Sequence, residues 1–280
     1  MSRTILITGA SDGIGAAAAR QLHDAGERVI IVGRDPVKTA RVADALEAPR
    51  YVADFADLDQ VRALAADVRT HHPRIDVLAN NAGGVFGERT LTIDGHERTF
   101  QVNHLAPFLL TALLQDLLTE NGASVIQTSS AAAQRFSRFD VDDLDGTRRF
   151  SRTTAYGNAK LANILFTVEL QRRHGASASR PGVSAVAFHP GVIASGFAAD
   201  SRGPWRWLYT NPLSRRLLTP VDVGGARLTW LALGVPGRDW TPGAYYERNR
   251  PAKPHPRAAD AHLAATLWER SAEMVGLPGS

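Results

Sequence analysis

Short runs of apolar and β-branched residues alternate along the chain with longer stretches in which apolar positions recur every three or four residues. This alternation is typical of repeated βαβ units, in which each helix returns the chain to the next strand of a parallel sheet. The short runs predict seven strands, over residues 4–8, 28–33, 50–53, 75–79, 124–128, 183–188 and 243–246. The longer stretches predict helices on both faces, one of which begins at Asp35-Pro36 because aspartate caps free amides and proline suits the first turn. We therefore expect a doubly wound α/β fold with a mainly parallel sheet.

One irregular stretch interrupts this rhythm, at residues 194–220, where glycine, proline, tryptophan and arginine are frequent. Since no linker or internal repeat divides the chain, we expect a single domain over residues 1–280. Long irregular segments of compact α/β domains often cover a binding site, so we expect this one to be a substrate lid. Its apolar side chains could line a hydrophobic cleft, lie on a membrane surface or pack the lid onto the domain; they are Trp205, Trp207, Leu208 and Tyr209.

Composition narrows the class of protein. The chain has 280 residues, 44% of them hydrophobic, and a formal net charge of +4, as in a soluble globular enzyme. Because it has no cysteine, disulfide frameworks, thiolate metal sites and thiol nucleophiles are excluded, and no metal site is expected. The charge comes almost entirely from arginines dispersed along the sequence, which argues against nucleic acid as a partner. No apolar run reaches the roughly 18 residues of a membrane span, and no leader precedes the first strand, so we expect a cytoplasmic protein.

A glycine-rich turn follows the first predicted strand. Residues 8–15 read TGASDGIG and lead directly into an alanine-rich stretch that favours helix. Gly9 can make the tight turn, Gly13 can let the backbone approach a pyrophosphate, and Gly15 can let the helix pack on the strand. A simple chain reversal is the alternative, because the spacing G-x-x-x-G-x-G differs from the G-x-G-x-x-G fingerprint. In this strand-to-helix context we expect a Rossmann-type dinucleotide site.

The end of the second predicted strand bears on which dinucleotide is bound. An NAD-preferring site has an acidic residue here on the ribose hydroxyls, whereas this chain has Gly33 followed by Arg34. A guanidinium can make a bidentate contact with a 2′-phosphate, so NADP(H) is favoured over NAD(H). The alternative is a surface arginine beside Asp35. Further along, Asp54-Phe55 and the Asn-Asn-Ala-Gly turn at residues 80–83 close the third and fourth strands, at the sheet edge where open α/β folds bind ligands.

Tyr156 and Lys160 are the chief candidates for chemistry. They lie four residues apart in a predicted helix, which places both on one face. A nearby ammonium stabilises a phenolate and lowers the pKa of tyrosine from its ordinary value near 10, which makes it a usable acid or base. A surface pair is the alternative, but this helix follows the fifth strand, whose end supplies Ser129 and Ser130 at the same sheet edge. A serine hydroxyl there can hydrogen-bond a substrate carbonyl.

Two further polar residues follow the 80–83 turn on the next predicted helix. Asn103 could hold a water that relays protons through Lys160, whereas His104 beside it is expected to be a packing residue. The apolar run over residues 108–118 predicts a helix buried on the sheet.

Together these motifs resemble those of the short-chain dehydrogenase/reductase family. They occur in that family's order across about residues 8–195: TGASDGIG, Asp54, the Asn-Asn-Ala-Gly turn, Asn103, Ser130, Tyr156 with Lys160, and His189-Pro190-Gly191. By this resemblance the catalytic tetrad is Tyr156 as acid and base, Ser130 as the hydroxyl that orients the substrate, Lys160 as the ribose binder that tunes Tyr156, and Asn103 as the holder of a water. Ser130 is preferred to Ser129 because the family usually uses the second serine of such a pair.

The resemblance also implies how the cofactor is held. Residues 190–192 would border the nicotinamide, and Ser195 would contact its carboxamide. The full set of expected cofactor-binding residues is Gly9, Ser11, Asp12, Gly13, Ile14, Gly15, Arg34, Asp54, Phe55, Asn81, Ala82, Gly83, Thr128, Tyr156, Lys160, Pro190, Gly191, Val192 and Ser195.

A closer resemblance, to the retinol-dehydrogenase-like branch and its bacterial relatives, rests on the run KLANILFTVEL at 160–170 and the tail LWERSAEMVGL. Retinoid specificity is not implied, because residues 194–220 are this chain's own. We expect an NADP(H)-dependent oxidoreductase that moves a hydride between the nicotinamide and a carbonyl or alcohol group of an apolar substrate. An NADP(H)-binding sensor or scaffold without turnover is the alternative, and an isomerase or dehydratase of the extended branch is a third possibility. The helix over 108–118 and the Tyr156 helix form dimer faces in the family, so a homodimer is expected, with a monomer as the alternative.

Overall fold

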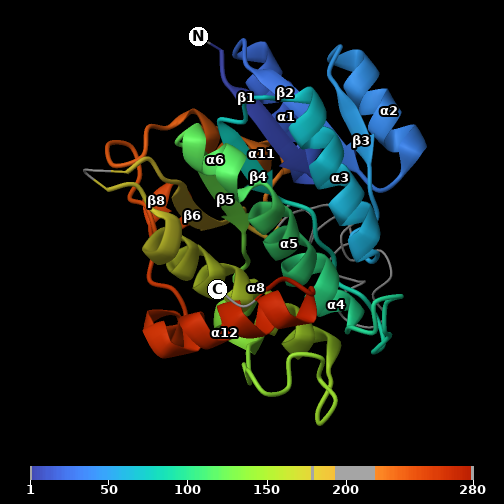
Figure 1. Ribbon diagram of the computed structural model, residues 1–280, viewed down its shortest axis with the longest axis vertical. Coiled ribbons are helices and arrows are strands. Elements are labelled where there is room, and N and C mark those ends of the chain that lie inside the picture. Colours follow the sequence, from blue (N-terminus) through green and yellow to red (C-terminus); the bar gives the residue numbers. More distant parts are fainter. Residues whose placement is uncertain (1, 178–179, 193–217, 279–280) are drawn as a thin grey trace.

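All strands of the computed structural model join one sheet, in the order β3-β2-β1-β4-β5-β6-β7-β8 (Figure 1). The model describes residues 2–177, 180–192 and 218–278. The strands are β1 (Thr4–Thr8), β2 (Arg28–Gly33), β3 (Arg50–Val52), β4 (Val77–Asn80), β5 (Ser124–Thr128), β6 (Ser184–His189), β7 (Tyr245–Glu247) and β8 (Arg250–Pro251). Neighbouring strands pair in parallel except β7 and β8, which are antiparallel. The predicted doubly wound α/β fold is confirmed.

The sequence predicts seven strands, whereas the described residues form eight. The strand that was missed is β8, which has only two residues, Arg250 and Pro251, and leaves no apolar run in the sequence. The predicted strand 75–79 is also displaced, since β4 begins at Val77. Asp76, just before it, holds the start of β1 instead: its Oδ2 accepts a hydrogen bond from the Thr4 amide at 2.8 Å.

Helices cover both faces of the sheet. They are α1 (Gly13–Asp24), α2 (Pro36–Ala45), α3 (Leu58–His71), α4 (Arg98–Phe100), the π-helix η1 (Gln101–Leu105), α5 (Ala106–Leu113), α6 (Gln115–Glu120), α7 (Ala132–Phe136), α8 (Arg152–His174), α11 (Val221–Leu233), the 3₁₀ helix η3 (Pro256–Ala259) and α12 (Ala261–Met274). Because alternate residues of a strand point to opposite faces, β1 serves two cores. Ile5 and Ile7 pack with α1, α2 and α11, whereas Leu6 packs with α3, α5, α8 and α12.

Two helix predictions can be compared with the structure. The helix expected at Asp35-Pro36 is confirmed: α2 begins at Pro36, and Asp35 caps it by accepting from the Lys38 amide at 2.9 Å. The single helix expected over 108–118 is wrong, because the chain leaves helical geometry at Leu114, where α5 ends and α6 begins. An apolar run alone does not reveal such a break, since both helices bury their apolar residues in the same core.

The C-terminal helix α12 packs against α8 and α5 (Figure 1). Trp268 stacks on Phe166 with ring centroids 5.6 Å apart and meets Phe108 edge-on at 5.1 Å. At the end of α8, Arg173 bonds both Glu169 and Glu269, each at 2.6 Å. The buried rings and the ion pairs therefore fix α12 to the sheet's helical layer.

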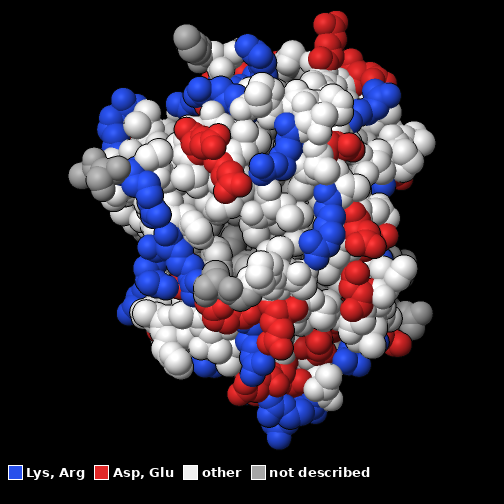
Figure 2. Space-filling model, viewed as in Figure 1, with Lys and Arg blue, Asp and Glu red and all other residues white. Residues whose placement is uncertain are grey.

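Charge is mixed on the face shown in Figure 2. Basic and acidic side chains are both spread over this face, around a largely uncharged middle. The arginines therefore do not form one basic surface there. None of the helices that the structure describes combines the length and apolar character needed to cross a bilayer.

Candidate active site

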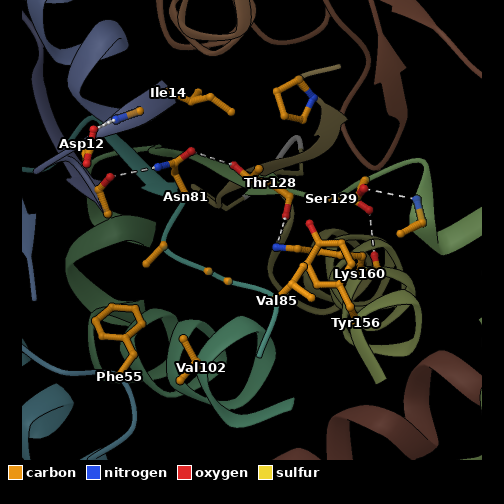
Figure 3. Close-up of a pocket in the computed structure, with 18 of the residues that line it drawn as sticks. Asp12, Ile14, Phe55, Asn81, Val85, Val102, Thr128, Ser129, Tyr156 and Lys160 are labelled. Carbon is orange, nitrogen blue, oxygen red and sulfur yellow. Dashed lines mark hydrogen bonds between the residues drawn. The ribbon is translucent and has the colours of Figure 1, made fainter. Parts of the chain in front are cut away.

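A cavity of about 820 Å³ lies along the carboxyl ends of the central parallel strands (Figure 3). Its walls come from the residues that directly follow β1, β2, β4, β5 and β6, together with one face of α8. After β3, at one edge of the sheet, the chain returns past β1 to form β4, so the strand order reverses between β1 and β4. Open α/β folds bind ligands at this kind of edge.

The glycine turn after β1 shapes one end of the cavity. Gly9 has φ +65°, and a Cβ there would lie 2.8 Å from the Ala82 Cα, so only glycine fits. A Cβ on Gly15 would lie 2.4 Å from the Gly9 carbonyl oxygen, which is why α1 can pack this close to the turn. Gly13 has φ +54°, and a Cβ there would meet nothing within 4 Å. The turn therefore leaves open space beside Gly13 at the N-terminus of α1, where Asp12 caps the helix by accepting from the Gly13 amide at 2.8 Å.

Two cations lie beside this turn. Arg34 and Lys38 both line the cavity, and Lys38 Nζ bonds Asp12 Oδ2 at 2.9 Å. This hydrogen bond holds the pKa of Asp12 below its ordinary value. The Asp35 carboxylate accepts from the Lys38 amide as the cap of α2. It therefore faces the start of this helix rather than the side chain of Arg34. Arg34 was expected from the sequence, and Lys38 was not.

Asn81 links the ends of three strands. Its side chain donates to the Thr8 carbonyl at 3.0 Å and accepts from Thr128 Oγ1 at 3.5 Å, while its amide and that of Ala82 donate to Thr8 Oγ1, both at 3.0 Å. The Asn-Asn-Ala-Gly turn thus fixes the cavity floor between β1 and β5 (Figure 3).

Tyr156 and Lys160 project from α8 into the same part of the cavity (Figure 3). The Lys160 ammonium lies over the Tyr156 ring, 5.5 Å from its centroid, and donates to the Thr128 carbonyl at 3.0 Å. Lys160 is only 2% exposed, and burial lowers the pKa of its ammonium to about 7. Because opposite charges stabilise each other, a phenolate on Tyr156 would favour the charged form of Lys160.

The two serines after β5 differ in what their hydroxyls do. Ser129 is buried and donates to the Lys160 carbonyl at 2.7 Å, which anchors α8 to the strand end. Ser130 is half-buried, lines the cavity, and accepts from the Ala132 amide at 3.1 Å. Ser130 therefore keeps a hydroxyl proton that can be donated to a ligand.

Asn103 lies behind the cavity wall rather than in it. It occupies the π-helix η1, donates to the carbonyls of Gly84 and Thr99 at 2.9 and 2.8 Å, and accepts from the Gly84 amide at 3.2 Å. A Cβ on Gly83 would lie 2.5 Å from Asn103 Oδ1 and 3.1 Å from Lys160 Nζ. The space that a side chain on Gly83 would occupy thus adjoins both polar groups.

The segment after β6 closes the cavity on the side of Ser130. Gly191 has φ +105° and donates its amide to His189 Nδ1 at 3.3 Å, and Arg227 holds the Pro190 carbonyl at 2.7 Å. Burial lowers the pKa of His189 to about 4, so this ring is a neutral acceptor. Val192 follows at the rim.

The structure brings most of the expected residues to this one cavity. The exceptions are Gly15 and Asn103, which support the lining residues from behind, and Ser195, which lies outside the described residues together with the expected lid apart from residues 218–220. The lining residues that sequence reasoning missed are chiefly Lys38, Gly84, Val85, Phe86, Val102, Arg135, Phe136, Arg152, Thr153 and His189. Lys38 had a usable signal, one helical turn after Arg34. The apolar members gave no signal of their own: Val85, Phe86 and Val102 adjoin the 80–83 turn or Asn103, but nothing in the sequence says which neighbours of a motif face the cavity. Within the described part of the chain, no group of three or more His, Asp or Glu side chains is arranged to hold a metal ion.

Comparison with known proteins places this chain in a family. Residues 3–204 match the family model described as short chain dehydrogenase. A Streptomyces sp. (strain C5) protein named for daunorubicin C-13 ketoreductase activity is 43% identical over 98% of this chain and 93% of its own length. Human retinol dehydrogenase 13 is 34% identical over 98% of this chain and 85% of its own. A crystal structure of a protein from Mycobacterium paratuberculosis, 32% identical, superposes with a TM-score of 0.78 over 99% of this chain and 95% of that one. The chain therefore belongs to the short-chain dehydrogenase family of oxidoreductases.

Proposed function

We propose that the protein is an NADP(H)-dependent oxidoreductase that interconverts a carbonyl and an alcohol on an apolar substrate. The observation that carries this proposal is the single cavity in which Tyr156, Lys160 and Ser130 lie at one end and Arg34 and Lys38 at the other. Both relatives named above bear names that refer to such an interconversion, a ketoreductase and a retinol dehydrogenase.

The residues present fit a phosphorylated dinucleotide. The turn has open space beside Gly13, which a larger side chain would fill, and this space lies at a helix N-terminus, which favours anions. Arg34 and Lys38 add positive charge beside it, where a 2′-phosphate would distinguish NADP(H) from NAD(H). Asp54, Asn81 and the 190–192 segment would hold the rest. When bound, the cofactor supplies the hydride; the protein supplies placement and proton transfer.

The chain's own residues can handle the proton. In reduction, the Tyr156 hydroxyl donates its proton to the substrate oxygen, which the Ser130 hydroxyl orients by a second hydrogen bond. The charge of Lys160, held at the Thr128 carbonyl, stabilises the phenolate that remains. In oxidation the same phenolate accepts the proton. Asn103, fixed behind Gly83, would hold a water that returns protons to Lys160.

The walls near this end support an apolar substrate. Val85 lies beside Tyr156 (Figure 3), Phe86 and Phe136 also line the cavity, and Arg98 lies over the Phe86 ring, 4.4 Å from its centroid. Apolar walls with a few convergent polar groups are the usual form of a small-molecule site. The name of the human relative, a retinol dehydrogenase, agrees with an apolar substrate.

Titration with NADPH and NADH, followed by turnover on apolar ketones and aldehydes, tests the proposal. We expect tighter binding of NADPH, and Arg34→Leu should weaken NADPH roughly 10- to 100-fold, the loss of one charge-assisted contact, while changing NADH little. Arg28→Leu is the matched control, since Arg28 is exposed at the opposite end of the strand that leads to Arg34 and does not line the cavity. Equal affinity for both dinucleotides would overturn the cofactor preference. Tyr156→Phe should bind NADPH normally and lose turnover; full turnover would overturn its assigned role.

A further inference from the structure

His104 is a buried imidazole that the reaction described above does not use. It lies in η1 next to Asn103 and is only 1% exposed. The rings of Phe100, Phe108 and Phe166 surround it, with centroids 5.0 to 6.2 Å away. Packing alone does not explain why this ring is a histidine, because both of its nitrogens face polar partners. Nδ1 lies 3.4 Å from Asn163 Oδ1, and Nε2 lies 2.9 Å from Ser271 Oγ of α12.

The direction of each hydrogen bond follows from one fixed acceptor. The Thr128 carbonyl can only accept, so the Asn163 group that faces it at 3.2 Å is the amide nitrogen, and the amide oxygen faces His104. The His104 Nδ1–H then donates to that oxygen, and Nε2 accepts from the Ser271 hydroxyl. This pattern requires a neutral ring. Burial lowers the pKa of His104 to about 4, which keeps the ring neutral at physiological pH.

Two donors from one helix meet at the Thr128 carbonyl. Asn163 is three residues beyond Lys160 in α8, and the Lys160 ammonium and the Asn163 amide bond this oxygen at 3.0 and 3.2 Å. Lysine is a point charge on a flexible four-carbon stem, so the place of its charge depends on its acceptor. A carbonyl held by a second, rigid donor is a fixed acceptor, and the rigidity of that donor depends in turn on His104.

We propose that Asn163 and His104 are positioning residues for Lys160: His104 orients the Asn163 amide, which fixes the Thr128 carbonyl that holds the ammonium beside Tyr156. The inference rests on the proposed roles of Tyr156 and Lys160. By this proposal α12 also supports the site, because the Ser271 hydroxyl of α12 hydrogen-bonds Nε2 of His104. None of these positioning residues lines the cavity.

Two variants interrupt the chain of hydrogen bonds while keeping its shape. Asn163→Leu removes both polar functions at nearly constant volume, and His104→Phe keeps an aromatic ring among the surrounding phenylalanines. His104→Asn is the rescue variant, because an asparagine amide can present a donor where Nδ1 stood. Thr167→Val is the matched control: Thr167 is buried one turn further along α8, and its hydroxyl bonds only the main-chain carbonyl of Asn163.

The pH profile of the alcohol-oxidation rate reports the pKa of Tyr156. A loosely held ammonium lowers that pKa less, so we expect it to rise by about half to one unit in Asn163→Leu and His104→Phe, with kcat down on the order of tenfold. His104→Asn and Thr167→Val should keep the parent pKa. The double variant should be no worse than Asn163→Leu alone, because both residues act through one acceptor. If Asn163→Leu and His104→Phe both kept the parent pKa of Tyr156, the proposal would be overturned. An equal rise of that pKa in Thr167→Val would overturn it as well.

A cofactor-free measurement stands beside the kinetics. The chain has only three lysines, Lys38, Lys160 and Lys253, so carbon-13 labelling at the lysine ε position gives signals that single variants can assign. A held ε-methylene has two inequivalent protons, and a mobile one averages them. We expect inequivalence at Lys160 in the parent and in Thr167→Val, and averaging in Asn163→Leu. Unchanged inequivalence in Asn163→Leu would overturn the proposal. Tyr156→Phe in the same series separates the catalytic role of Tyr156 from the positioning of Lys160. If this variant turns over normally, the proposed catalytic role fails, whereas the Lys160 signals of Asn163→Leu still test the positioning.

Discussion

Gly83→Ala should damage both stability and activity, because an added methyl group has no room. The new Cβ would lie 2.5 Å from Asn103 Oδ1, closer than carbon and oxygen can approach, so the Asn103 amide must move. That amide makes three hydrogen bonds, with Thr99 O, Gly84 O and Gly84 N. At about 0.5 to 1.5 kcal/mol net for each bond, losing all three would cost roughly 1.5 to 4.5 kcal/mol. At about 2 °C per kcal/mol for a chain of this size, Tm should fall by roughly 3 to 9 °C.

Lys160 is affected by the same methyl group. Its Nζ would lie 3.1 Å from the new Cβ, so the ammonium must shift by a few tenths of an ångström from its place at the Thr128 carbonyl, and kcat should fall on the order of tenfold. Gly87→Ala is the control, because Gly87 lies in the same loop with nothing within 4 Å of an added Cβ. Thermal unfolding and NADPH-dependent turnover should be measured on both variants. If Gly83→Ala were as stable and as active as Gly87→Ala, the reasoning from this contact would be refuted.

Three further variants test the packing that supports the site. Glu169→Gln should lose about 1 to 3 kcal/mol of unfolding free energy at pH 7. The bond from Arg172 lowers the pKa of Glu169 in the folded protein, so this stabilisation is present above pH 4.5, the ordinary value, and is lost as pH falls through the lowered pKa. Urea unfolding of parent and variant should therefore converge in acid, and a constant difference down to pH 2 would contradict this account. Trp268→Ala should cost about 3 to 5 kcal/mol by the same measurement; a loss below 1 kcal/mol would show that the aromatic cluster is not a core. Gly225→Ala would set its Cβ 2.8 Å from the Ala17 Cβ, forcing α11 away from α1, and should cost about 1 to 3 kcal/mol; an unchanged Tm would refute that contact.

The architecture was predictable from sequence because its central strands are buried runs of β-branched and aliphatic residues with clear limits. β1, β2 and β5 begin and end where the pattern predicts them. Strands of two or three residues carry little such signal, which is why β8 was missed and β7 was displaced. The break at Leu114 was missed for a different reason, since it lies inside an unbroken apolar run whose residues remain buried on both sides.

The polar residues of the site follow strand ends, and strand ends could be read from the pattern. Arg34, Asn81 and Ser130 all lie where a parallel strand finishes, so their meeting at one cavity follows from topology. Side chains that depend on tertiary packing could not be placed in this way. Phe86 and Phe136 belong to no motif, and the partner of His104 on α12 lies 167 residues away along the chain. Asn163 did leave a signal, as a polar residue within the apolar run of α8.

The contact between Ser271 and His104 also has a consequence for synthesis on the ribosome. Every residue assigned above to the cavity precedes α12 in the chain, so α12 is translated after all of them. Parallel strands pair over long sequence separations, and such contacts form slowly. A nascent chain that has emerged only through β8 contains every strand of the sheet that the structure describes, yet the aromatic rings around His104 still lack Trp268, and the imidazole still lacks its hydroxyl partner. Completion of the site therefore waits for residues 261–274, and premature stop codons before them should yield chains that are retained by chaperones rather than released as partly active enzyme.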